Sequence, residues 1–146
     1  MSDMQLAVLD HTIQLMNIWL KKMMVEHHFE TRHDAYSALR AVLHALRDRL
    51  TPEQAVHFGA QLPILVRGVY YEGWRITEKP ASDRQVDEFV LRVAAELPPQ
   101  FPRDALGVTR AVFQLLWEEL DPGETAKIID TLPAALKGLW PIPAQR

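Results

Sequence analysis

The chain repeats one pattern of residues at an interval of 70 positions. When residues 40–70 are aligned without gaps on residues 110–140, nine of the 31 positions are identical. The identical residues of the first copy are Arg40, Ala41, Val42, Leu46, Leu50, Pro52, Leu62, Pro63 and Gly68. Self-similarity at a fixed period indicates a repeated structural unit. We therefore predict two tandem pseudo-repeats, about 1–76 and 77–146, packed into a single compact domain over residues 1–146.

The composition is that of a globular domain and excludes several classes of function. With 146 residues, 48% of them hydrophobic, the chain can bury a core without disulfides or structural metals. Because Cys is absent, disulfides, thiolate nucleophiles and Cys-ligated metals are excluded. A net charge of −3 argues against nonspecific binding to nucleic acid. No run of 18 apolar residues predicts a membrane span, and Asp3 and Asp10 occupy the region where a signal peptide carries positive charge. We expect a cytoplasmic protein.

The N-terminal residues are expected to form one long helix. Ser2 and Gln5 have the spacing of a capping box. Apolar residues at alternating intervals of three and four predict a core-facing stripe, which consists of Leu6, Leu9, Ile13, Met16, Leu20 and Met23. Four further apolar residues lie off this stripe, namely Val8, Leu15, Ile18 and Val25. A helix that is apolar on more than one face is either deeply buried or packed against another subunit.

Capping residues mark the starts of the other predicted helices. These starts are Asp34, Thr51 and Pro63 in the first repeat, and Ser82 (with Gln85), Asp104, Asp121 and Pro133 in the second. At residues 51–54, for example, Thr-Pro-Glu-Gln provides an N-cap, a first-turn Pro and a Gln at the third helical position. The predicted fold class is therefore all-α, with about four helices in each repeat, packed into one compact helical unit.

Residues 64–71 are the one segment that also has the composition of a buried strand, because they are rich in β-branched and aromatic residues. The matching residues 134–139 are mostly helix formers, so the repeat favours a helix in both copies. Gly68 and Gly138 recur at the same position of this helix. Their recurrence suggests close packing against another backbone; the alternative is a helix that breaks at the Gly.

A family resemblance is carried by residues 60–74 (AQLPILVRGVYYEGW), together with the Arg-Ala-Val-Leu at 40–43 and the Leu-Thr-Pro-Glu at 50–53. In the second half, residues 110–113 and 121–124 add to it, as do Leu132-Pro133 and Leu139-Trp140-Pro141. Over about residues 35 to 140 the chain resembles the bacterial family called domain of unknown function 2267. The resemblance implies an all-helical cytosolic bacterial protein with no established reaction, so it assigns no catalytic residue.

A group of His and carboxylate residues lies at a predicted connection between helices. The segment His27–Asp34 contains three of the six His of the chain. Its candidate metal ligands are His27, His28, Glu30 and His33, because imidazole and carboxylate groups bind zinc, iron and nickel. Their spacing matches no established metal signature. The alternative interpretation is a solvated polar connection.

The sequence contains no arrangement typical of nucleophilic or nucleotide-dependent catalysis. Of the three Ser residues, Ser2 and Ser82 are predicted caps, and Ser37 lies in the first turn of a predicted helix. No Gly-x-Ser-x-Gly elbow, Gly-x-Gly-x-x-Gly loop or P-loop is present. We therefore propose no catalytic residue and no cofactor, and the sequence favours a non-enzymatic protein.

A second candidate region combines aromatic and Arg side chains at the end of the fourth predicted helix. Arg67, Tyr71, Trp74 and Arg75 are of the residue types that anchor interfaces, so they form a candidate interaction surface. The structural alternative is that Tyr70 lies in the core, as its counterpart Trp140 would, and that Trp74 packs on the linker between the repeats.

These observations leave three hypotheses for function. The first is a non-enzymatic interaction or regulatory module that binds a protein partner or self-associates as a homo-oligomer, without nucleic acid or membrane. The second is a metal-binding protein or metalloenzyme that uses the His27–Asp34 segment. The third is a carrier that holds a small ligand in a pocket between the repeats, because helix interfaces can form cavities without a sequence signature.

Overall fold

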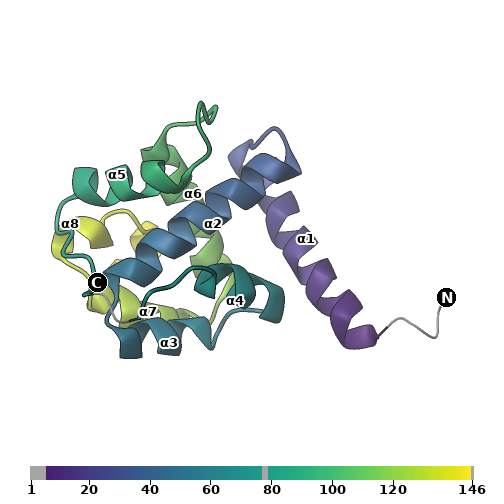
Figure 1. The fold of residues 1–146 in the computed structure, drawn as a ribbon, viewed down its shortest axis with the longest axis horizontal. Coiled ribbons are helices and arrows are strands. Elements are labelled where there is room, and N and C mark those ends of the chain that lie inside the picture. The colour runs from purple at the N-terminus through teal and green to yellow at the C-terminus, as the bar shows by residue number, and fades with distance from the viewer. Residues whose placement is uncertain (1–5, 77–78, 146) are drawn as a thin grey trace.

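The computed structural model describes residues 6–76 and 79–145 as a set of helices joined by short connections (Figure 1). In chain order these are α1 (Ala7–His27), α2 (Arg32–Arg49), α3 (Pro52–Gly59), α4 (Ile64–Tyr71), α5 (Val86–Glu96), α6 (Ala105–Glu119), α7 (Pro122–Asp130), α8 (Ala134–Lys137) and the 3-10 helix η2 (Ile142–Ala144). No strand occurs within these two ranges, which confirms the all-α fold class. No helix in the described part of the chain is long and apolar enough to cross a membrane.

Three helices begin at the caps predicted from the sequence. Thr51 and Gln54 form a reciprocal capping box, in which each side chain accepts a hydrogen bond from the backbone N–H of the other, at 3.2 and 3.1 Å. The carboxylate of Asp104 accepts from the Gly107 N–H at 2.9 Å. The carboxylate of Asp121 caps α7 in the same way, because it accepts from the Glu124 N–H at 2.9 Å. These caps satisfy backbone donors that the first turn of a helix leaves free.

Two predicted helix starts are wrong by a few residues. Helix α2 begins after Thr31, whose hydroxyl accepts from the Asp34 N–H at 3.0 Å, so Asp34 lies inside the helix rather than at its cap. Helix α5 begins after Gln85, whose N–H donates to Glu88 at 3.0 Å, and Ser82 remains in the linker. The cap of α2 lies three residues before the predicted one, and the cap of α5 lies three residues after it. The predicted capping box of Ser2 and Gln5 lies outside the described residues.

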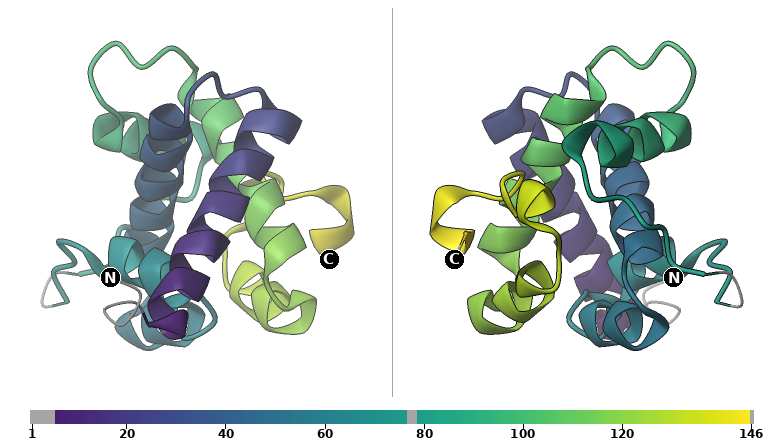
Figure 2. Two further views of the ribbon diagram at one scale, coloured as in Figure 1. Left: turned by 90° about the vertical axis from the view of Figure 1, so that its right-hand side faces the viewer. Right: turned by 90° about the vertical axis from the view of Figure 1, so that its left-hand side faces the viewer.

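Helices α2 and α6 form the centre of the molecule. They pack against each other, α1 contacts both of them on one side, and α5 contacts both on the other (Figure 2). The fully buried side chains of this centre include Leu39, Val42, Leu43, Leu46, Val112, Leu115 and Leu116. Helices α3 and α7 contact each other at one end of the central pair. The arrangement uses both halves of the chain for one core.

The predicted aromatic core positions are confirmed. Tyr70 is fully buried, and its hydroxyl donates to the Ala55 carbonyl at 2.7 Å. Trp140 is also buried and stacks on Phe113 with 3.9 Å between ring centroids. Burial raises the pKa of the Tyr70 hydroxyl, because the ionised form would lose its hydration. The two tandem pseudo-repeats remain a prediction from the sequence.

Residues 64–71 form helix α4, as the repeat predicted, but the role assigned to the recurring Gly is wrong. Helix α4 continues through Gly68 to Tyr71, and no atom lies within 4 Å of the place where a Cβ on Gly68 would stand. Gly138 follows the last residue of α8 as its C-cap and would touch only the Ala135 carbonyl, at 3.4 Å. The close packing expected at these Gly residues is therefore absent, whereas the alternative of a helix that breaks at the Gly holds in the second copy, because α8 ends at Lys137. The close approach occurs at Gly59, where a Cβ would collide with Tyr71.

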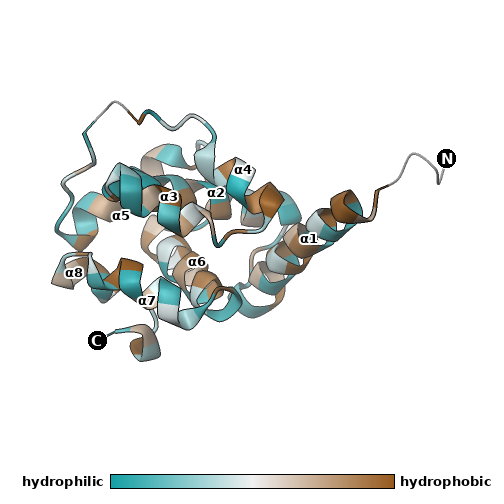
Figure 3. Cartoon of the chain, turned by 90° about the horizontal axis from the view of Figure 1, so that it is seen from below, coloured by the Kyte–Doolittle hydropathy of each residue, from teal (hydrophilic) through white to brown (hydrophobic). Residues whose placement is uncertain are grey.

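The predicted core-facing stripe of α1 is correct only in the C-terminal half of the helix. Met16, Leu20 and Met23 are buried, whereas Leu6, Leu9 and Ile13 are each more than half exposed. The reason is the length of α1 relative to its neighbours. Helix α6 ends at Glu119, whose carboxylate binds Lys22 at 2.9 Å, so the N-terminal half of α1 extends past α6. This half projects from the body with apolar residues at its surface (Figure 3).

Two Gly→Ala substitutions should change stability in opposite directions. Gly59→Ala places a methyl group within 2.8 Å of the Tyr71 ring, so we expect the free energy of unfolding to fall by about 1–3 kcal/mol through overpacking. Gly68→Ala adds a methyl group at a helical position with no neighbouring atom, so the free energy of unfolding should rise by about 0.5–1 kcal/mol. Urea denaturation of both variants and the wild type measures the difference. Equal effects of the two substitutions would contradict the packing described.

Candidate functional site

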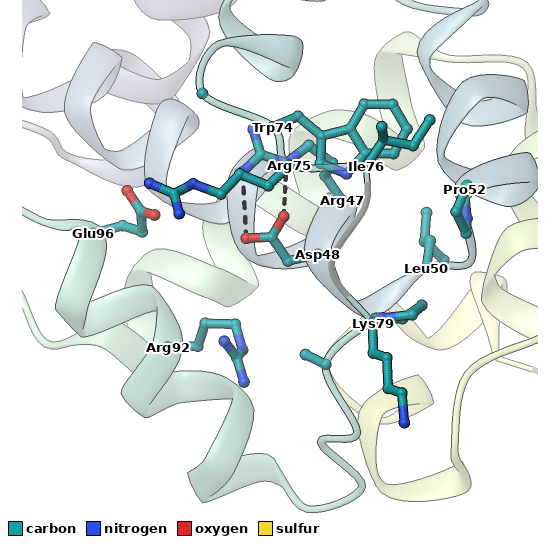
Figure 4. A pocket seen from close by; sticks show the side chains of 13 residues that line it. Arg47, Asp48, Leu50, Pro52, Trp74, Arg75, Ile76, Lys79, Arg92 and Glu96 are labelled. Atoms are coloured by element: carbon teal, nitrogen blue, oxygen red, sulfur yellow. Dashed lines mark hydrogen bonds and ion pairs between the residues drawn. The ribbon is translucent and has the colours of Figure 1, made fainter.

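A cavity of about 440 Å³ lies where the two halves of the chain and their linker meet (Figure 4). We call it the junction pocket. It is lined by Arg47, Asp48, Leu50, Pro52, Gly73, Trp74, Arg75, Ile76, Lys79, Pro80, Ala81, Arg92 and Glu96. These residues come from the end of α2, the start of α3, the segment after α4, the linker and α5. The volume is within the range of pockets that hold small molecules, roughly 300–1,000 Å³.

Arg47 forms the rigid base of the junction pocket. Its residue surface is only 4% exposed, although it carries a charge. One guanidinium nitrogen donates to the carbonyls of Tyr70 and Glu72, at 3.0 and 2.9 Å. The other donors of the group bind both carboxylate oxygens of Asp48, at 2.8 and 3.3 Å. Arg47 is therefore paired and hydrogen-bonded, as a buried charge must be, and it fixes the end of α4 to α2.

The linker is attached to both halves of the chain. The Ala81 N–H donates to the Asp48 carbonyl of α2 at 2.7 Å. The buried carboxylate of Asp83 accepts two hydrogen bonds from Arg92 of α5, at 2.8 and 3.0 Å. Arg49 of α2 binds the Asp83 carbonyl at 2.6 Å. The bond to Asp83 also raises the pKa of Arg92, so the cation is retained. These contacts hold residues 81–83 of the linker against α2 and α5, beside the pocket.

Trp74 and Arg75 enter the junction pocket through a tight turn after α4. Gly73 has a φ of 73°, a conformation that residues with a side chain rarely adopt. The turn brings the Trp74 ring over Tyr71, with 5.6 Å between centroids and 30° between planes. In Figure 4, Trp74 and Arg75 lie on one side of the pocket and Lys79 and Arg92 on the other.

The charged side chains around the pocket are predominantly basic. Four cations line it, Arg47, Arg75, Lys79 and Arg92, against the carboxylates of Asp48 and Glu96. Asp48 is neutralised by Arg47, and Glu96 lies 3.6 Å from both Arg40 and His44. Both carboxylates of the lining thus have cationic or imidazole partners of their own. The lining is basic on balance, with four cations against two carboxylates, although Arg47 and Arg92 are themselves paired with Asp48 and Asp83.

The structure brings together only part of the interaction surface predicted from the sequence. Trp74 and Arg75 line the junction pocket, and Tyr71 supports Trp74 from behind. Arg67 does not line the junction pocket. It has a structural role, because its guanidinium donates to three carbonyls at and just after the end of α3. These bonds go to Gly59 at 3.0 Å, Ala60 at 3.2 Å and Leu62 at 2.9 Å.

Sequence reasoning missed Arg47, Lys79 and Arg92. Arg47 and Arg92 lie 45 positions apart in helices whose pattern shows them only as surface cations. No local charge signal marks them, because residues 72–96 contain four basic residues, at 75, 79, 84 and 92, against six acidic ones, at 72, 78, 83, 87, 88 and 96.

The four candidate metal ligands are not assembled into a metal site. His27 ends α1, and its carbonyl accepts from Arg103 at 2.8 Å. His28 adopts a left-handed conformation with a φ of 61° and, like Glu30 and His33, is exposed. Burial lowers the pKa of His27, which favours the neutral imidazole. Among the residues that the structure describes, no group of three His, Asp or Glu side chains could hold a metal ion.

Comparison with known families gives a match over most of the chain. The model of the family described as "Uncharacterized conserved protein (DUF2267)" matches residues 16–139. The chain belongs to the DUF2267 family. None of the curated proteins matches it significantly. The family assignment confirms the resemblance found in the sequence and carries no assigned reaction.

In this DUF2267 protein, the imidazole of His44 is buried next to the junction pocket. Its Nε2 lies 2.7 Å from the Val69 carbonyl and donates to it. Its Nδ1 lies 3.6 Å from Glu96. Burial lowers the pKa of His44, and the charges of Arg47 and Arg40 act in the same direction. The neutral imidazole is thus the form that the fold accommodates.

Acidification should therefore destabilise the protein. An unfolded His44 binds a proton at its ordinary pKa of 6.5, whereas the folded imidazole binds it only at lower pH. Its stabilisation is complete above pH 6.5 and is lost as the pH falls through the folded pKa. We expect the free energy of unfolding to decrease between about pH 7 and pH 5. In His44→Gln, whose amide can still donate to Val69, the decrease should be smaller. Denaturant titrations at several pH values measure both slopes, and identical slopes would contradict the role of His44.

Proposed function

We propose that this protein is a non-enzymatic interaction and regulatory module whose junction pocket binds a small anionic ligand bearing a phosphate or carboxylate group. The observation that carries the proposal is the set of cations from α2, the segment after α4, the linker and α5 around one cavity of about 440 Å³. Phosphates and carboxylates are the groups that Arg recognises best, because its planar fork matches their oxygens.

The preorganisation of these cations supports the proposal. Arg47 is held by two carbonyls and by Asp48, and Arg92 is held by two bonds to the buried Asp83. The charges of both side chains are therefore fixed beside the cavity. Their hydrogen-bond donors already bind Asp48 and Asp83, so the proposal assigns the direct contacts with a ligand to Arg75 and Lys79. Lys79 is exposed and lines the same cavity, so its ammonium group can move to meet the ligand.

The lining residues also support binding rather than chemistry. The described lining contains no Ser, Thr, Cys or His, so it has no hydroxyl or thiol nucleophile and no imidazole base. Its carboxylate at Asp48 is engaged by Arg47. A regulatory role is favoured by position, because a ligand in this pocket contacts both halves of the chain and their linker. Binding to the folded state alone stabilises that state by mass action.

Titration with pyrophosphate and with citrate tests the proposal for the two anionic groups. We expect saturable binding of at least one probe at one site per chain, measured by calorimetry at low ionic strength. Arg75→Ala and Lys79→Ala should each weaken the affinity about tenfold, since each removes one charge-assisted contact. Trp fluorescence provides a second readout, because Trp74 lines the pocket, and Trp74→Phe identifies its share of the signal from the four Trp residues.

Arg84→Ala is the matched control for these variants. Arg84 is exposed, carries the same charge and does not line the junction pocket. Its loss should change the affinity by less than about twofold, since distant exposed charges are screened. The proposed function would be refuted by linear, non-saturating heats with both probes. It would also be refuted if Arg84→Ala lost as much affinity as Arg75→Ala and Lys79→Ala, because the anions would then bind through nonspecific attraction to the charged surface.

A further inference from the structure

The N-terminal half of α1 extends beyond what the repeated fold requires. At the interval of 70 residues, Val86 at the start of α5 corresponds to Met16 of α1. Helix α5 has 11 residues and α1 has 21, and residues 9–15 of α1 correspond to residues 79–85, which are not helical. The match to the DUF2267 family also begins at residue 16. Both observations set the first half of α1 apart from the common helical frame.

This extension is apolar and uncovered. Leu6, Val8, Leu9 and Ile13 are between 51% and 57% exposed. The first turn of α4 lies beside them, because the Leu65 N–H donates to the Thr12 hydroxyl at 3.1 Å. Ile64 and Leu65 in that turn are themselves 60% and 39% exposed. We call the five residues Leu6, Leu9, Ile13, Ile64 and Leu65 the α1–α4 apolar face.

The five side chains of the face leave on the order of 500 Å² of apolar surface exposed, which is within the range of about 300–600 Å² for the largest patch on a monomer. A stable interface buries about 800 Å² on each partner, and somewhat more than half of that area is apolar. The apolar area of the face is therefore close to that of one such interface.

The charges and the spacing of the face favour a second copy of the same chain as its partner. Asp10 is the only acidic or basic residue between Leu6 and Leu20, counting His as neutral, so the face has no charge pattern that selects an oppositely charged protein. It also lacks the Lys and Arg that flank helices bound to anionic lipid surfaces. Leu6, Leu9 and Ile13 continue the three-and-four spacing of the buried stripe, which is the spacing that packs one helix along another.

We propose that the α1–α4 apolar face binds the same face of a second copy of this chain in a two-fold symmetric dimer. The α1 helices run antiparallel, with Leu9 of each copy opposite Ile13 of the other. A two-fold interface uses one patch twice, so it needs no second surface on the molecule. The inference does not rest on the junction pocket, which is formed by other residues.

Sedimentation of the full chain over a range of concentrations tests the dimer. We expect a dimer at micromolar concentration. In the double variant Leu9→Glu, Ile13→Glu the dissociation constant should increase at least 100-fold, because the interface would then bury four carboxylates, two from each copy. Both positions are more than half exposed, so the fold should persist, and circular dichroism checks this.

The control is Leu91→Glu, at an apolar position of α5 that is 71% exposed and outside the face. It should leave the dimer intact. A wild-type chain that stays monomeric at all concentrations, or a dimer that survives Leu9→Glu, Ile13→Glu, would overturn the proposal. A monomer that binds phosphatidylglycerol vesicles through Leu9 and Ile13 would assign the face to lipid and would also overturn it.

Disulfide cross-linking tests the orientation of the helices. The chain contains no Cys, so a single introduced Cys can form a disulfide only with another chain. A mixture of Leu9→Cys and Ile13→Cys chains should cross-link faster than Leu9→Cys alone, since the antiparallel pairing places positions 9 and 13 opposite each other. Leu91→Cys should cross-link slowest. Faster cross-linking of Leu9→Cys alone would refute the antiparallel arrangement.

Discussion

The hydrogen bonds that α2 donates to the end of α4 fix the segment from which the chain leaves the first half of the fold. Eleven of the 18 residues of α2 are buried, and they face α1, α4, α5 and α6. Two of the buried residues are His44 and Arg47, which a core tolerates only when their polar groups are bonded. They bind the carbonyls of Val69, Tyr70 and Glu72. The last carbonyls of a helix have no partner within the helix, so α2 caps α4 from the side.

The same bonds determine where the junction pocket forms. Arg47 holds the chain at Glu72, and the left-handed Gly73 then reverses its direction and returns Trp74 over Tyr71. The linker continues from there and is attached to Asp48 of α2 and Arg92 of α5. The pocket is therefore built by contacts that the fold already needs for stability. Its basic character follows from the use of Arg, the side chain whose several donors can bridge carbonyls and carboxylates at once.

Local patterns in the sequence predicted the helices well, because caps act within one turn. Thr51, Asp104 and Asp121 were each found from three neighbouring residues. Two kinds of information were absent. The periodicity of α1 identified which residues share a face, but not that this face is covered only from Met16 onward, while Leu6, Leu9 and Ile13 stay exposed. The roles of Arg67 and Arg47 were also hidden, because each depends on carbonyls that only the tertiary fold brings near.

Burial of α2 by both halves has a consequence for how the protein folds as it is synthesised. The first half leaves the ribosome before α5 and α6 exist, and these are the helices that cover one side of α2. At this stage the nascent chain exposes part of the future core and has not yet formed the contact between Asp83 and Arg92. Domains fold as units when their last core element becomes available. The ordered core can therefore form only after most of the second half has emerged, and until then the exposed side of α2 is a surface on which a chaperone can act.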